Sequence, residues 1–152
     1  MAIVQAVCNS FKKELLESKH AFANGGATFK LALFTSSANL SKAPTAYSTT
    51  AEISNTSGSA YNAGGETLTG QSVTGGSGAD IAFVDFSNNP QWTSASFTAN
   101  GAMIYNTTTD GGSGTTNAVC ILAFGADFTA SNGTFTITFP AADTTNAILR
   151  LS

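Results

Sequence analysis

Few side chains in this 152-residue sequence could carry acid–base chemistry. Four of its carboxylates are candidates for a catalytic pair: Glu52, Glu66, Asp80 and Asp85. A glycosidase needs two such acids about 5–10 Å apart, one to protonate the leaving group and one to act as base or nucleophile. Asp85 stands between two apolar residues of a strand-like run, where a buried aspartate with a hydrogen-bond partner is the commoner interpretation.

The single histidine, His20, has no nucleophile near it in the sequence. The numbers of serines and aspartates alone do not exclude a Ser-His-Asp triad. The sequence has, however, no GxSxG motif, in which a nucleophilic serine often stands. One histidine and two cysteines without CxxC or HxxxH spacing cannot make an ordinary zinc site unless carboxylates join them. We therefore interpret His20 as a polar residue near a helix C-terminus, where a positive charge is mildly favoured. We expect the protein to bind no metal and no cofactor.

Two GGSG runs, Gly75–Gly78 and Gly111–Gly114, lack the Lys-Ser/Thr that a phosphate-binding loop requires. Asp110 lacks the alternating Asp/Asn ligands of a calcium loop. Cys8 and Cys120 both lie in apolar runs, which favours buried free thiols over the disulfide that their number permits. With no catalytic constellation in view, we expect that the protein is not an enzyme.

Residues 2–19 are predicted to form one amphipathic α-helix. The apolar residues of one face recur at helical spacing: Val4, Val7, Cys8, Phe11 and Leu15. Two interpretations stay open. The helix could lie on the protein's own sheet with its charged face in water, or it could be an arm that docks on a neighbouring subunit.

Residues 27–152 alternate with period 2 and predict strands separated by turns rich in Gly and Asn. The clearest runs are TFKLALFT (28–35), DIAFVDF (80–86), AVCILAF (118–124), GTFTITF (133–139) and NAILRLS (146–152), with weaker ones at 65–73 and 92–98. AVCILAF is apolar on both faces, as in a central strand. We predict a single domain over 1–152, mainly β, an antiparallel β-sandwich or barrel of about eight strands with one N-terminal α-helix.

Two Asn-Gly pairs predict turns. Asn100-Gly101 is expected to join 94–99 to 102–106 in a type I′ hairpin, because both residues adopt positive φ at little cost. Asn132-Gly133 is expected to form the turn before the Thr/Phe strand.

The aromatic residues could pack in the core or offer ring faces to a ligand. Trp92 and Tyr105 are expected to pack across or beside the hairpin. Together with Tyr47 and Tyr61, exposed rings would instead suit a glycan-binding module.

Charge and hydropathy limit the partners. Six basic residues and a net charge of −3 argue against a nucleic-acid partner, because phosphate binding needs clustered Lys and Arg. No run approaches the roughly 20 apolar residues of a membrane helix. The N-terminal residues lack a signal-peptide pattern, so we expect synthesis in the cytoplasm and no membrane partner.

The sequence resembles small virion structural proteins of tailed bacteriophages over nearly its whole length. The likeness lies in AIVQAVCNSFKKELLE, TFKLALFTSSANL, AYNAGGETLTG, AFVDF, WTSASFTANGAMIYN and AVCILAFGADFTASNGTFTITFPAADTTNAILR, in that order. The resemblance implies a virion location and an assembly role without family catalytic residues. Within that class, size and the helix-plus-sandwich pattern favour a capsid decoration (cement) protein. It would bind the major capsid protein and other copies of itself. A tail or neck component and a glycan-binding host-recognition module are the alternatives.

Overall fold

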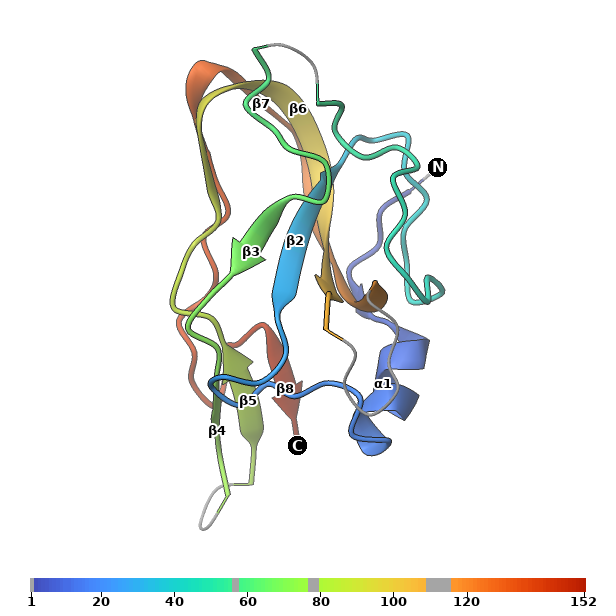
Figure 1. Cartoon of the computed structure of the whole chain (residues 1–152), viewed down its shortest axis with the longest axis vertical. Coiled ribbons are helices and arrows are strands. Elements are labelled where there is room, and N and C mark those ends of the chain that lie inside the picture. The colour runs from blue at the N-terminus through green and yellow to red at the C-terminus, as the bar shows by residue number, and fades with distance from the viewer. Residues whose placement is uncertain (1, 56–57, 77–79, 109–115) are drawn as a thin grey trace.

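The computed structural model describes residues 2–55, 58–76, 80–108 and 116–152. It has two antiparallel sheets and one short helix, α1 (Asn9–Leu16), so the predicted mainly-β, sandwich-like class is confirmed (Figure 1). The first sheet has the order β1 (Ala6–Val7), β7 (Asn117–Thr136), β6 (Gln91–Asn106), β2 (Phe29–Phe34), β3 (Glu66–Leu68). The second has the order β4 (Ser72–Thr74), β5 (Ala82–Asp85), β8 (Leu149–Leu151).

Strands β6 and β7 form a long two-stranded ribbon that bends over at the top of Figure 1. Their pairing register shifts at several bulges, and Ser94, Gly125 and Asn132 have positive φ within the ribbon. Bulges bend a strand and increase its twist. The ribbon therefore belongs to the first sheet at one end and curls away from it at the other. Two long strands thus contain runs that the sequence predicted as separate, shorter strands.

The predicted hairpin at Asn100-Gly101 is wrong. Both residues lie inside β6, which runs without a turn from Gln91 to Asn106. The glycine is needed for close approach: a Cβ on Gly101 would lie 2.7 Å from Ile3 Cγ2 and 2.7 Å from the Leu122 carbonyl oxygen. The predicted turn at Asn132-Gly133 is also wrong, because these residues lie inside β7 and Asn132 is the extra residue of a bulge.

These two Asn-Gly pairs make a matched test. We expect Gly101→Ala to lower the free energy of unfolding by about 1–3 kcal/mol, because the new methyl overpacks against the N-terminal segment and β7. Gly133→Ala should change it by less than about 0.5 kcal/mol, since the nearest atom to its Cβ would be 4.0 Å away. Urea unfolding followed by the fluorescence of Trp92, the one tryptophan of the chain, measures both. Equal stabilities would contradict the placement of Gly101 inside β6.

The predicted helix over 2–19 is wrong at both ends. Residues 6–7 form β1, in which Val7 pairs with Cys120, and Ile3 forms a parallel bridge with Leu40. The edge of β7 thus provides hydrogen-bond partners for the backbone of residues 6–7, which would not pair with β7 if they were helical. At the other end, Ser18 has φ 60°, outside the right-handed helical region, so the helix ends at Leu16. Within Asn9–Leu16 the predicted face is correct, because Phe11 is buried.

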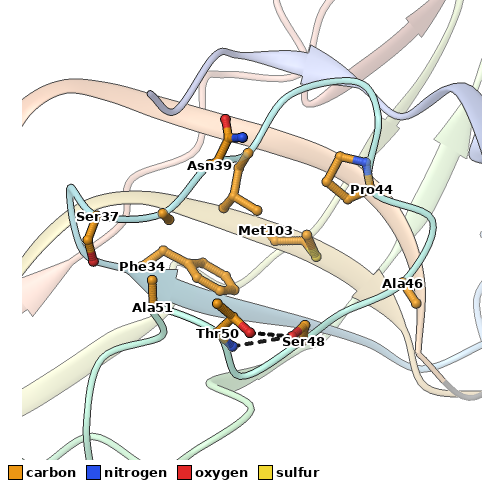
Figure 2. Close-up of a pocket in the computed structure, with 11 residues that line it drawn as sticks. Phe34, Ser37, Asn39, Pro44, Ala46, Ser48, Thr50, Ala51 and Met103 are labelled. Atoms are coloured by element: carbon orange, nitrogen blue, oxygen red, sulfur yellow. Dashed lines mark hydrogen bonds between the residues drawn. The ribbon is translucent and has the colours of Figure 1, made fainter. Parts of the chain in front are cut away.

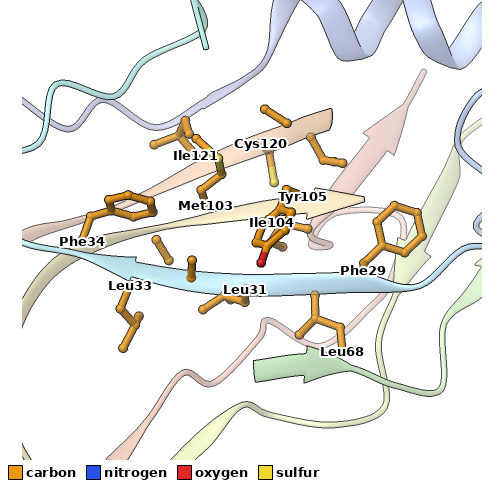
Figure 3. Close-up of a cluster of buried hydrophobic side chains, with 14 of the residues drawn as sticks. Phe29, Leu31, Leu33, Phe34, Leu68, Met103, Ile104, Tyr105, Cys120 and Ile121 are labelled. Atoms are coloured by element: carbon orange, nitrogen blue, oxygen red, sulfur yellow. The ribbon is translucent and has the colours of Figure 1, made fainter. Parts of the chain in front are cut away.

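The core lies on both faces of β2. Leu31 and Leu33 point to one side, whereas Phe34 points to the other, toward Met103 and Ile121 (Figure 3). All five side chains are buried. Residues 118–124 lie in the first part of β7, which stands between β1 and β6 in the sheet, as their apolar character predicted. In GTFTITF, the predicted inward side chain of Phe135 is buried, but the strand ends at Thr136.

Candidate functional site

The structure does not assemble the proposed carboxylate candidates into a site. Asp80 and Asp85 belong to the region of the second sheet, with Asp85 half-buried in β5. Glu66 lies in β3, and Glu52 forms an isolated bridge with Phe34 of β2. Within the described residues, Glu52 alone of the four has hydrogen-bond partners for its side chain, and none of those partners is another carboxylate.

Glu52 is the centre of a partly buried polar network. Its Oε2 accepts a hydrogen bond from the Tyr47 hydroxyl at 2.6 Å. Its Oε1 accepts one from the Tyr61 hydroxyl and one from the Gly64 amide, each at 2.7 Å. The Tyr61 hydroxyl in turn accepts a hydrogen bond from the Leu33 amide of β2. With both oxygens engaged, the carboxylate ties Tyr47, Tyr61 and Gly64 together beside the first sheet.

The three tyrosines stay neutral donors in this network. Burial raises the pKa of Tyr61 far above its usual value, and the nearby Glu52 raises it further. Burial and the hydrogen bond to Glu52 raise the pKa of Tyr47. Burial and the charge of Glu52 raise the pKa of Tyr105 to about 12. Tyr105 stacks on Tyr47 with ring centroids 4.4 Å apart and donates to the Gly64 carbonyl. The hydrogen bonds of this network connect Tyr61 and Gly64 to strands β2 and β6 of the first sheet.

His20 occupies a buried triple that its sequence position did not predict. Its Nε2 lies 2.8 Å from Glu14 Oε2, and its Nδ1 lies 3.1 Å from Asn106 Nδ2. The Asn106 amide is oriented by donation to the Lys19 carbonyl, so its Nδ2 donates to Nδ1 and the Nε2–H donates to Glu14. In a catalytic triad the second ring nitrogen must face a nucleophile. Here both nitrogens are occupied by other partners.

Both cysteines are free and buried, as the sequence predicted. Burial, with a smaller contribution from the charge of Glu14, raises the pKa of Cys8 to about 11. Burial raises the pKa of Cys120 to about 12. Because the thiolate is the reactive form, these thiols are poor nucleophiles at neutral pH.

The aromatic residues that could have offered ring faces to a sugar lie in the core. Trp92, Tyr61 and Tyr105 are buried, and Tyr47 is half-buried against Tyr105. Tyr61 packs against Trp92 at a centroid distance of 5.9 Å. The expectation that Trp92 and Tyr105 pack inside the protein is correct, and the burial of Tyr61 with them leaves three of the four rings closed to a sugar.

The glycine-rich loops lie largely outside the described residues. Gly111–Gly114 and Asp110 are not described, nor are Ser77 and Gly78 of the other run. In the described ranges, no three or more His, Cys, Asp and Glu side chains gather closely enough to hold a metal ion. Nor is any described helix long and apolar enough to cross a membrane.

A cavity of about 530 Å³ lies between β2 and the segment 37–51 (Figure 2). Phe34 and Met103 form its apolar floor, and hydroxyl groups stand on its rim. Two of these hydroxyls already bind each other, since Ser48 Oγ donates to Thr50 Oγ1 at 3.1 Å. No charged side chain is among the described residues that line it. The cavity therefore offers little to orient a ligand.

An apolar cleft of about 550 Å³ separates α1 from the second sheet. Figure 1 places α1 and β8 at the same end of the molecule. Phe11, Phe22, Val84 and Leu149 are buried in the cleft wall. Phe11 and Phe22 meet edge to face, with centroids 5.9 Å apart, so the wall next to the helix is rigid aromatic surface.

Large apolar side chains remain exposed on the rim of this α1 cleft. Leu16 at the end of α1 is 89% exposed, Leu151 of β8 is 61% exposed and Val73 of β4 is 54% exposed. Five described large apolar residues are more than half exposed, and three of them lie here. Exposed apolar side chains gathered beside an apolar cleft are a common feature of interaction surfaces, which makes this cleft the candidate functional site. Sequence reasoning missed it because it joins residues 11–16 to 149–151.

The α1 helix packs against the first sheet of its own domain. It contacts β7, and its Phe11 is buried beside His20 and Phe22. Leu16 nevertheless points away from that contact into water. The structure therefore agrees with the first interpretation, a helix packed within the domain, whereas docking on a neighbouring subunit stays a prediction.

Comparison of the chain with protein-family models, curated proteins and solved structures gives no match.

Proposed function

We propose that this protein is a non-enzymatic virion structural protein that decorates and stabilises the head of a tailed bacteriophage. It would be made in the cytoplasm of the infected bacterium and would bind the major capsid protein, next to other copies of itself. The observation that carries the proposal is the α1 cleft with its rim of exposed apolar side chains. A protein that works by docking needs such a surface, and the resemblance of the sequence supplies the class of assembly.

The apolar and aromatic walls of the cleft resemble the centre of a protein–protein interface. Interfaces combine a hydrophobic core with a polar rim, and a few buried apolar or aromatic anchors supply most of the binding energy. Here a partner would cover Leu16, Val73 and Leu151 while filling the space beside Phe11. A tail or neck component would use the same chemistry, so the assembly must be identified by experiment.

The test uses capsids and tails from a phage that lacks the gene. We expect purified protein to sediment with the capsids and to saturate at a copy number set by the symmetry of the shell. Saturable binding to isolated tails alone would replace the head assignment by the tail alternative. Retention on a glycan array with no binding to either particle would favour the host-recognition alternative.

Two valine variants assign the binding to the cleft. Val73 and Val4 are 54% and 53% exposed, but only Val73 lines the cleft. We expect Val73→Ser and Leu16→Ser each to weaken capsid binding about fivefold or more, whereas Val4→Ser binds like the original chain. Melting temperatures should stay close together, because all three side chains are exposed. Equal binding by all the variants would show that the cleft is not the docking surface.

A further inference from the structure

We infer that the α1 cleft takes a protruding polypeptide segment of the partner that carries carboxylates among apolar side chains. The inference rests on the proposed docking function and adds the chemistry of the partner. It starts from two cations. Lys12 of α1 and Arg150 of β8 both line the cleft and are both exposed. They are two of only six basic residues in the chain.

These cations have no ion-pair partner within the described residues. The acids in and just after α1 are engaged elsewhere: Glu14 pairs with His20, and Glu17 pairs with Lys13 and Lys19. No carboxylate is among the described residues that line the cleft.

Asp143 lies within electrostatic range of Arg150, but its oxygens already accept hydrogen bonds from Thr145 and Asn146. In a chain of net charge −3, the α1 cleft is therefore a local positive site with apolar walls. Its electrostatic complement is an occupant that brings negative charge.

The shape of the surface favours a polypeptide over other anionic amphiphiles. A small ligand in the cleft would leave the rim residues Leu16, Val73 and Leu151 in water, whereas a folded partner covers them. A bilayer offers a smooth surface that cannot fill a concave site, whereas a helix or loop with apolar side chains can. Carboxylates on that segment would meet Lys12 and Arg150, and charge complementarity of this kind sets specificity and association rate.

The test uses short synthetic peptides that share one leucine pattern and carry Glu, Gln or Lys at the polar positions. Binding of each labelled peptide to the full chain is measured by fluorescence anisotropy at low and high salt. We expect the Glu peptide to bind about tenfold more tightly than the Lys peptide. The preference should shrink at high salt, because the cations are exposed.

Charge variants show whether the two cations cause the preference. In Lys12→Gln/Arg150→Gln the Glu and Gln peptides should bind equally, whereas Lys42→Gln, which removes an exposed lysine outside the cleft lining, should keep the preference. Leu16→Ser should weaken all three peptides. Equal binding of the three peptides to the original chain would overturn the inference, as would loss of the preference in Lys42→Gln. Binding to anionic vesicles that Leu16→Ser abolishes would replace it by a membrane contact.

The capsid assay separates the two proposals. A Glu preference that depends on Lys12 and Arg150, together with no binding to capsids or tails, would refute the virion role and leave the cleft chemistry standing. Normal capsid binding by Lys12→Gln/Arg150→Gln at all salt concentrations would refute the cleft chemistry and leave the virion role standing.

Discussion

Replacing Gly65 by alanine is expected to lower the free energy of unfolding by about 2–5 kcal/mol. Gly65 has φ 74°, and a Cβ there would lie 1.8 Å from the Leu31 carbonyl oxygen and 2.7 Å from Ala32 Cα. These are backbone atoms of the central part of β2, so no side chain can move aside to make room. The residue comes just before β3, where the chain turns in against the sheet.

Gly25→Ala separates the backbone strain from the collision. Gly25 has a similar φ of 79°, but nothing lies within 4 Å of its Cβ position. Its substitution should cost about 1–2 kcal/mol, the price of a left-handed conformation. Urea denaturation of both variants, followed by Trp92 fluorescence, gives the difference. If Gly65→Ala were no less stable than Gly25→Ala, the close approach of this turn to β2 would be wrong.

The mainly-β class could be predicted because its signal is local. In TFKLALFT and GTFTITF the side-chain period of 2 is carried by neighbouring residues, and no distant contact is needed to read it. The same is true of the helical face that contains Phe11. The ends of the helix were not predictable in this way, because β1 forms on the edge of β7, more than a hundred residues later in the chain.

The Asn-Gly pairs show how a local signal can be overridden. Asn-Gly favours a tight turn by its backbone preferences, worth a small amount of free energy. At Gly101 the deciding fact is that Ile3 packs where a side chain would stand. That requirement comes from a segment almost a hundred residues away. A turn needs glycine for its positive φ, whereas this position in a strand needs glycine because there is no room for a side chain.

The candidate sites were the least predictable part. Glu52 was considered only as one of four acids for a catalytic pair, and nothing in the sequence indicated its two tyrosine partners. His20 meets Asn106 across 86 positions of sequence. The α1 cleft needs the second sheet to bring β8 beside the helix, and no pattern within either segment indicates that contact.

Removing the Glu52 carboxylate is expected to lower the free energy of unfolding by about 2–4 kcal/mol, because a buried donor left without an acceptor costs about 1–3 kcal/mol. In Glu52→Ala the Tyr61 hydroxyl, which is fully buried, and the buried Gly64 amide both lose their acceptor. Tyr47 is half-exposed and can turn to water, so it adds little. Chemical denaturation measures the loss.

Glu66→Ala and Glu52→Gln are the matched controls. Glu66 also flanks β2 and is half-buried, but its side chain has no hydrogen-bond partner among the described residues, so its removal should cost less than about 1 kcal/mol. Glu52→Gln keeps an oxygen that can accept from Tyr61 and Gly64, and its stability should lie between those of the original chain and Glu52→Ala. Equal stabilities of Glu52→Ala and Glu66→Ala would mean that the hydroxyls find water instead. Tyr47 and Tyr61 would then be held by their apolar contacts and not by the carboxylate.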